Sequence, residues 1–118
     1  YWVTSEEAIV AVAYKVLGQS APSATTDTSL YTVPSATETV VSTITVCNRG
    51  SSSGTYRIAV RPDGASLANQ HYIAYDISLG AKSLETLSLG ITVDATDIIA
   101  VYASTGDFSF SAFGSEIS

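Results

Sequence analysis

Apolar residues alternate with hydroxylated ones along most of this chain, in short runs separated by small polar residues. The pattern is longest from Glu38 to Arg61, where it predicts two strands joined by a loop of Arg, Gly and Ser. β-Branched and aromatic residues with a period of two suit a half-buried pleated surface. Because residues 48–50 and Gly54 supply turn formers, we expect these two strands to form a hairpin.

Further strands are predicted at intervals of ten to twelve residues. Pro62-Asp63-Gly64 is the strongest turn between them, since proline presets φ and glycine can take a positive φ. The other predicted strands cover residues 30–33, 71–78, 83–89, 97–103 and 108–117, with residues 90–96 as a connection. About eight such strands predict an all-β fold, an antiparallel β-sandwich of the jelly-roll or immunoglobulin-like kind.

The start of the chain fits two interpretations. Thr4 and Glu7 have the spacing of a capping box, which would open a helix that Gly18 ends. The β-branched residues and their alternation instead favour a strand over about Val10–Leu17. We divide the chain into residues 1–13, an N-terminal arm or first strand, and residues 14–118, the β-sandwich domain.

The first three residues, Tyr1, Trp2 and Val3, carry large apolar side chains. They predict that the N-terminal segment docks on a partner protein. The alternative is that Trp2 folds back on its own domain.

Length and composition indicate one packed domain. A chain of 118 residues with 46% hydrophobic and 14% charged residues can bury about two-thirds of its unfolded surface. The net charge of −6 argues against direct binding of nucleic acid. No apolar run reaches the ~18 residues that a membrane span needs, so a membrane partner is not expected. Cys47 is the only cysteine and is expected to be a small buried hydrophobe.

Residues that could carry chemistry are few. His71 is the only histidine, and no strained serine turn accompanies it, so we predict no enzyme. One Cys and one His cannot form a tetrahedral zinc site, and no cofactor is predicted. Asp94 and Asp97 could join Asp107 around a calcium ion, although ordinary turn capping explains each of them as well.

An aromatic cluster offers a second interpretation. Tyr72 and Tyr75, with His71, Asn69 and Asp63 nearby in the sequence, could line a shallow sugar-binding surface. The two tyrosines have opposite parity on a strand, so one of them is expected in the core unless a bulge intervenes.

Several short segments of the sequence are distinctive. From about Tyr14 onward, the sequence resembles small virion structural proteins of tailed bacteriophages, including marine and cyanobacterial phages. The phrases that carry the resemblance are LYTVP, VCNRG, RIAVRP, ANQHYIAYD and FGSEI, at residues 30–34, 46–50, 57–62, 68–76 and 113–117. The resemblance implies a β-sandwich subunit on the surface of a particle, in the capsid-decoration or tail-accessory category.

Together these observations predict a non-enzymatic structural subunit of a phage particle, exposed on the virion and bound to other virion proteins. We expect a homo-oligomer that decorates or cements the capsid or tail, with Tyr1, Trp2 and Val3 among its contacts. The alternative is a receptor- or glycan-binding module of a tail fibre or neck appendage, which would use His71 and Tyr75.

Overall fold

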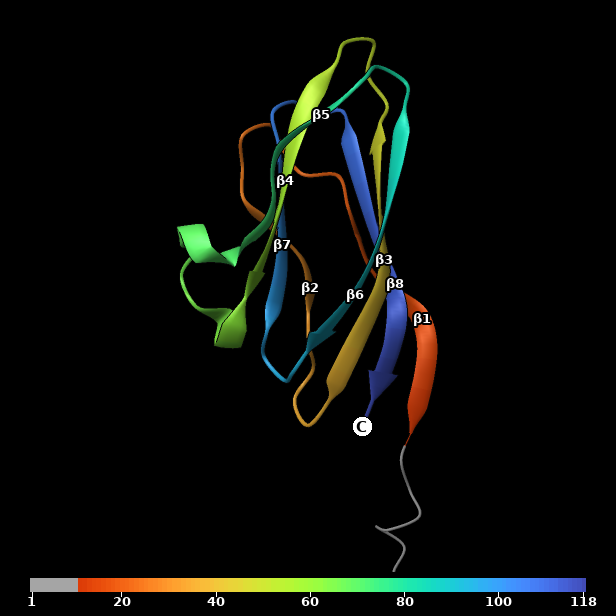
Figure 1. Ribbon diagram of the computed structural model, residues 1–118, viewed down its shortest axis with the longest axis vertical. Coiled ribbons are helices and arrows are strands. Elements are labelled where there is room, and N and C mark those ends of the chain that lie inside the picture. Colours follow the sequence, from red (N-terminus) through yellow and green to blue (C-terminus); the bar gives the residue numbers. More distant parts are fainter. Residues whose placement is uncertain (1–10) are drawn as a thin grey trace, which may run out of the picture.

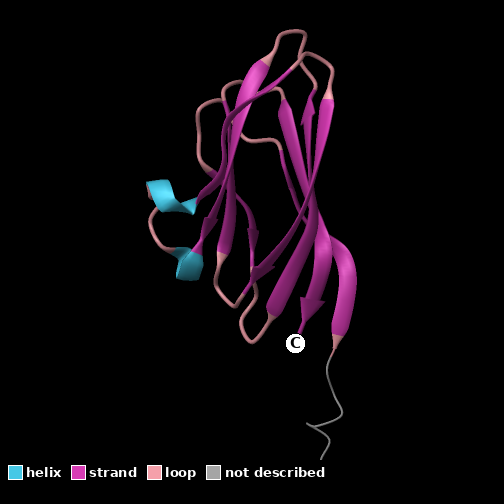
Figure 2. Ribbon diagram, viewed as in Figure 1, coloured by secondary structure: helices cyan, strands magenta, loops and turns pink. Residues whose placement is uncertain are grey.

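The computed structural model describes residues 11–118, which form two antiparallel sheets of four strands packed face to face (Figures 1 and 2). Two short 3₁₀ turns, Pro62–Gly64 and Asn69–His71, are the helical elements of this part of the chain. The strands are β1 (Val12–Ser20), β2 (Thr28–Thr32), β3 (Glu38–Asn48), β4 (Gly54–Arg61), β5 (Tyr72–Leu79), β6 (Leu84–Val93), β7 (Ile98–Ala103) and β8 (Phe108–Ile117). The predicted all-β sandwich of about eight strands is confirmed.

The strand order is that of a jelly roll. Sheet A has the order β1-β8-β3-β6, and sheet B has the order β2-β7-β4-β5. The first strand pairs with the last, the second with the seventh, the third with the sixth and the fourth with the fifth. The chain is therefore one long antiparallel ribbon rolled into two sheets, which is the jelly-roll member of the two predicted classes.

The expected hairpin between Glu38 and Arg61 is wrong. β3 belongs to sheet A and β4 to sheet B, so the loop between them crosses from one sheet to the other. The buried side chain of Asn48 holds this loop, because its amide donates to the carbonyls of Ser52, Leu79 and Gly80. Each strand finds its partners far along the chain, and the local turn residues do not decide that choice.

Two further boundaries differ from expectation. Residues 90–93, predicted as a connection, continue β6 past a bulge in which Gly90 has a φ of 61°. The helix considered for the start of the chain is wrong over β1, which is a strand as favoured. β1 runs on past Gly18, where a Cβ atom would collide with the carbonyl of Leu30, so glycine lets β1 lie close against β2.

The core lies between the sheets and is built around three aromatic rings. Tyr56, Phe108 and Phe110 are almost fully buried, with ring centroids 6.2 to 6.4 Å apart. Alternate residues of the central strands complete it, as the period-two pattern requires, together with Val33 just after β2. The aliphatic members that are fully buried are Val33, Val41, Ile44, Val46, Ile58, Ile99 and Val101.

Candidate interaction surfaces

The exposed large apolar side chains of residues 11–118 lie on edge strands. They are Val12, Tyr14 and Val16 on β1, Ile73, Tyr75 and Ile77 on β5, and Leu84 and Leu89 on β6. The central strands of both sheets bury their large apolar residues or cover them in part. Edge strands have unpaired backbone groups on one side, and exposed apolar patches mark contacts with other molecules. The edges are therefore where we look for function.

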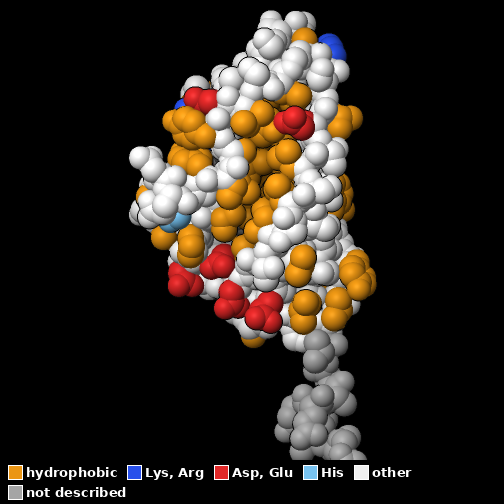
Figure 3. All heavy atoms as spheres, in the orientation of Figure 1, with side chains coloured by type: hydrophobic (Ala, Val, Ile, Leu, Met, Phe, Trp, Pro, Cys, Tyr) orange, Lys and Arg blue, Asp and Glu red, His pale blue; other side chains and the backbone are white. Residues whose placement is uncertain are grey.

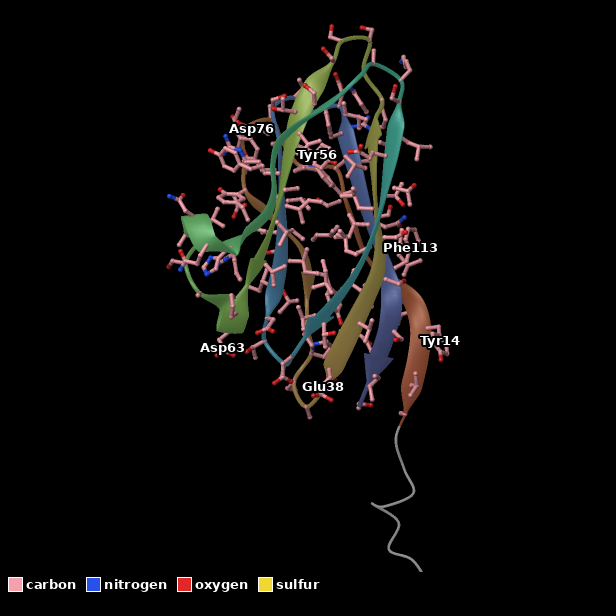
Figure 4. All side chains as sticks on the ribbon, viewed as in Figure 1. Tyr14, Glu38, Tyr56, Asp63, Asp76 and Phe113 are labelled. Carbon is pink, nitrogen blue, oxygen red and sulfur yellow. The ribbon has the colours of Figure 1, made fainter. Side chains whose placement is uncertain are left out.

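The first surface is the β1 stripe, which we define as Val12, Tyr14 and Val16. Their alternation puts all three on the outer face of sheet A. Tyr14 is 85% exposed and borders a shallow depression that Phe113 of β8 also lines. Figure 4 shows Tyr14 and Phe113 on the same side of the sandwich, pointing away from the core.

The second surface is the β5–β6 groove, where the sandwich opens along one flank. It is a cleft of about 290 Å³ between the edge strands of the two sheets. The residues that line it are Tyr56, Ile58, Ile73, Ala74, Ile77, Glu85, Leu87 and Leu89. Figure 3 shows its apolar side chains as a band running down the middle of the molecule. Tyr56 and Ile58 of the core form its floor and remain buried, while Ile73, Ile77 and Leu89 at its rim are exposed.

One polar pair lies in the β5–β6 groove. The hydroxyl of Tyr56 donates to a carboxylate oxygen of Glu85. Burial raises the pKa of Tyr56, and the bond to Glu85 raises this pKa further. Glu85 still has acceptor capacity for a donor that enters the groove, because a carboxylate accepts about four hydrogen bonds.

The third surface is a tyrosine–arginine cluster on the outer face of sheet B. The guanidinium carbon of Arg57 lies 4.2 Å from the ring centroid of Tyr75 and 4.2 Å from that of Tyr102. Asp76 accepts from Nε of Arg57 at 2.6 Å, which is the main reason that the pKa of Arg57 is raised. Cation–π stacking on two faces fixes the arginine in place.

Tyr72 joins this cluster, which corrects the expectation that one of the two tyrosines would be in the core. The rings of Tyr72 and Tyr75 are 4.8 Å apart at 82°, and Tyr75 is 53% exposed. The reason is that β5 has two register shifts against β4, and Asp76 has a φ of 50°. These bulges bring residues of opposite parity to one face, where both tyrosines line a shallow depression with Asn69.

The predicted contact residues fall in different places. Nδ1 of His71 accepts a hydrogen bond from the backbone N–H of Ala68 at 3.1 Å, so the ring holds the loop before β5. Tyr75 belongs to the tyrosine–arginine cluster. Tyr1, Trp2 and Val3 lie outside the described residues.

The aspartates considered for calcium do not come together. Asp97 accepts from the backbone N–H groups of Asp63 and Asp94, both at 2.8 Å, and so ties two loops at one end of β7. Asp107 follows the other end of β7, so the proposed set of three is wrong. Within residues 11–118, no group of three or more Asp, Glu, His or Cys side chains could hold a metal ion.

A polar cluster between the sheets closes the end of the sandwich near β1. The hydroxyl of Tyr31 donates to Oε2 of Glu116 at 2.5 Å, and Oε1 of Glu116 lies 2.7 Å from Nζ of Lys15. The hydroxyl of Thr39 is 2.8 Å from that of Tyr31 and acts as its donor, because the tyrosine proton is already used. Burial and Glu116 raise the pKa of Tyr31 to about 12, while Lys15 and then Tyr31 lower that of Glu116.

Sequence reasoning missed the β5–β6 groove. A signal was present in β5, which carries Ile73 and Ala74 side by side, and both of them line the groove. A strand that covers the core with only one face is expected to carry polar residues on its other face. Apolar residues at both parities of a strand therefore point to a further contact.

The fold and these surfaces define a class, an eight-stranded jelly-roll domain with apolar edge strands. No helix in the described part of the chain is long and apolar enough to cross a membrane. No protein-family model matches the sequence, and neither the curated proteins nor the solved structures include a significant match to it.

Proposed function

We propose that this chain is a non-enzymatic structural subunit of a bacteriophage particle, which decorates or cements the capsid or the tail through protein–protein contacts. The observation that carries the proposal is the placing of the exposed apolar residues on edge strands of a jelly roll. Surface-exposed edges of soluble proteins are usually protected by charged residues or proline. Here they carry Tyr, Val, Ile and Leu, which suits a subunit that is covered by neighbours.

The fold and the charge agree with this role. Jelly rolls occur in viral capsid proteins and in lectins, so the fold alone does not choose between an assembly subunit and a binding module. The resemblance to small virion proteins of tailed phages supports a phage particle as the assembly to which the chain belongs. A net charge of −6 makes nucleic acid a poor partner.

Incorporation into particles tests the proposal. Phage particles purified from cells that express the chain should contain it, as detected by mass spectrometry and by antibody labelling in electron micrographs. Deleting residues 1–8 should abolish incorporation and leave the unfolding transition unchanged. Absence of the unshortened chain from purified particles would overturn the proposal. Normal incorporation of the shortened chain would show that the N-terminal segment is not needed for the contact.

A second function is favoured by one specific observation, the tyrosine–arginine cluster. Tyr72 and Tyr75 present rigid aromatic area beside the amide of Asn69, a combination that suits a sugar ring. In this reading the chain is a receptor- or glycan-binding module of a tail fibre or neck appendage. Tyr72→Ala and Tyr75→Ala should then lower adsorption to host cells without unfolding the domain, whereas Thr86→Ala, at an exposed position outside these surfaces, serves as the control. Unchanged adsorption in both variants would exclude this function.

A further inference from the structure

The two apolar surfaces of sheet A lie at its opposite edges. β1 is one edge strand of this sheet and carries the β1 stripe, while β6 is the other and forms one wall of the β5–β6 groove. Two strands, β8 and β3, separate them, a span of roughly 14 Å at the usual strand spacing. The stripe projects from the face of the sheet, and the groove opens sideways along its edge. The two surfaces therefore point in different directions.

A single kind of contact can cover both surfaces. Stripe packed on stripe would leave the groove open, and groove facing groove would leave the stripe exposed. We infer that the β1 stripe of one copy inserts into the β5–β6 groove of a second copy. This inference rests on the proposed role as an assembling subunit, and it names the surfaces by which copies meet.

The chemistry of the two surfaces is complementary. The stripe presents a knob, Tyr14, and the groove is a cleft of about 290 Å³ with an apolar lining. A buried tyrosine needs a partner for its hydroxyl. Glu85, the one carboxylate in the groove, can accept that hydrogen bond beside the one it already takes from Tyr56.

Contact between different surfaces is head-to-tail. Such contacts close into a ring or continue as a filament, and they leave one free stripe and one free groove on an open chain of copies. A stable contact buries about 1,600 Å² in total, so strands next to the stripe and the groove must also take part. Each copy carries a charge of −6, so salt should strengthen the association by screening the repulsion between copies.

Two single substitutions test the contact. Tyr14→Asp removes the knob, and Leu89→Asp places a charge in the groove. Both positions are exposed in the single copy, so circular dichroism and thermal unfolding should match the unchanged protein. Thr86→Asp is the control, because it adds the same charge to an exposed position of β6 that does not line the groove.

Sedimentation equilibrium of the full chain gives the readout. The unchanged protein and Thr86→Asp should form concentration-dependent species of three or more copies, while each variant alone should associate roughly 30-fold more weakly or worse. A mixture of Tyr14→Asp and Leu89→Asp should form dimers only. In such a mixture the intact stripe of the second variant meets the intact groove of the first, and neither variant can add another copy.

Other results would overturn the inference. A monomeric unchanged protein would do so, as would a Leu89→Asp variant that still assembles, which would indicate stripe packed on stripe. Failure of the mixed variants to form dimers would exclude the head-to-tail arrangement. Incorporation into particles is measured separately. A chain that is monomeric in solution but present in virions would exclude this contact between copies and would still support the structural role.

Discussion

Replacing Tyr31 by Phe removes one oxygen atom from the polar cluster between the sheets and leaves the ring in place. Tyr31 is 7% exposed, and its hydroxyl joins Glu116 to Thr39. The substitution creates little empty space, so its effect isolates the hydrogen bonds. We expect Tyr31→Phe to lower the free energy of unfolding by about 2.5–6 kcal/mol at neutral pH.

This magnitude has two sources. A hydrogen bond to a charged acceptor contributes roughly 1.5–3 kcal/mol, and the carboxylate of Glu116 loses one such donor. Thr39 is fully buried and would lose the acceptor of its hydroxyl, which adds a cost of about 1–3 kcal/mol for an unsatisfied buried group. The double variant Tyr31→Phe/Thr39→Val should therefore be more stable than Tyr31→Phe alone, because no hydroxyl is left without a partner.

The effect should depend on pH in a defined direction. Lys15 and Tyr31 lower the pKa of Glu116 in the folded protein, so the carboxylate stabilises the fold above its unfolded pKa of about 4.3. This contribution is lost as the pH falls through the lower folded value, and the difference between Tyr31→Phe and the unchanged protein should shrink there. At high pH, Tyr31 ionises near pH 10 in the unfolded chain and at about 12 in the folded one, so its contribution is lost between these values.

Urea unfolding followed by far-ultraviolet circular dichroism measures all of these differences. The reasoning is refuted if Tyr31→Phe costs less than about 0.5 kcal/mol at neutral pH, the range of an ordinary surface substitution. It is also refuted if the cost is the same below about pH 4.

Two further predictions concern packing. Gly18→Ala places a methyl group against the carbonyl of Leu30 and should lower the free energy of unfolding by roughly 1–3 kcal/mol. The control is Gly106→Ala, which has no atom within 4 Å of the added carbon and should change the free energy of unfolding by less than about 0.5 kcal/mol. Equal stabilities in urea would contradict the close approach of β1 and β2. Phe110→Ala should cost about 3–5 kcal/mol because it empties a core site, while Phe113→Ala, on the other face of β8, should cost far less. Comparable losses would mean that β8 does not divide core from surface as described.

The period-two pattern predicted the fold class and the positions of most strands, because it reports which face of each strand is buried. It could not predict the partner of a strand. Residues 49–53 contain the glycine and serine of a hairpin loop, yet they carry the chain from sheet A to sheet B. Pairing between strands far apart in the sequence decides to which sheet each strand belongs. β3 lies between β8 and β6, and β4 lies between β7 and β5. No local residue pattern encodes these pairs.

The interaction surfaces were harder to predict for a related reason. Parity along β5 assigned Tyr72 and Tyr75 to opposite faces, and two bulges reversed that assignment. The interpretation of Tyr75 as a surface residue nevertheless agrees with its exposure. His71 makes a local structural contact, the hydrogen bond that its Nδ1 accepts from the backbone N–H of Ala68.

The two flanks of the sandwich differ in a way that bears on function. Between β1 and β2, Gly18 removes a side chain and lets the sheets close over the core. On the other flank, β5 has two irregular steps and β6 has a bulge at residues 89–90, and the groove lies between these strands. Bulges can protect an edge strand from unwanted pairing with another chain. An edge that is only protected in this way would also be expected to carry charged side chains. Ile73, Ile77 and Leu89 stand there instead, and leaving such residues in water forgoes roughly 25 cal/mol for each Å² that a closed flank would bury. An open apolar flank is thus unfavourable for the isolated domain, and the same area becomes favourable once a partner fills it.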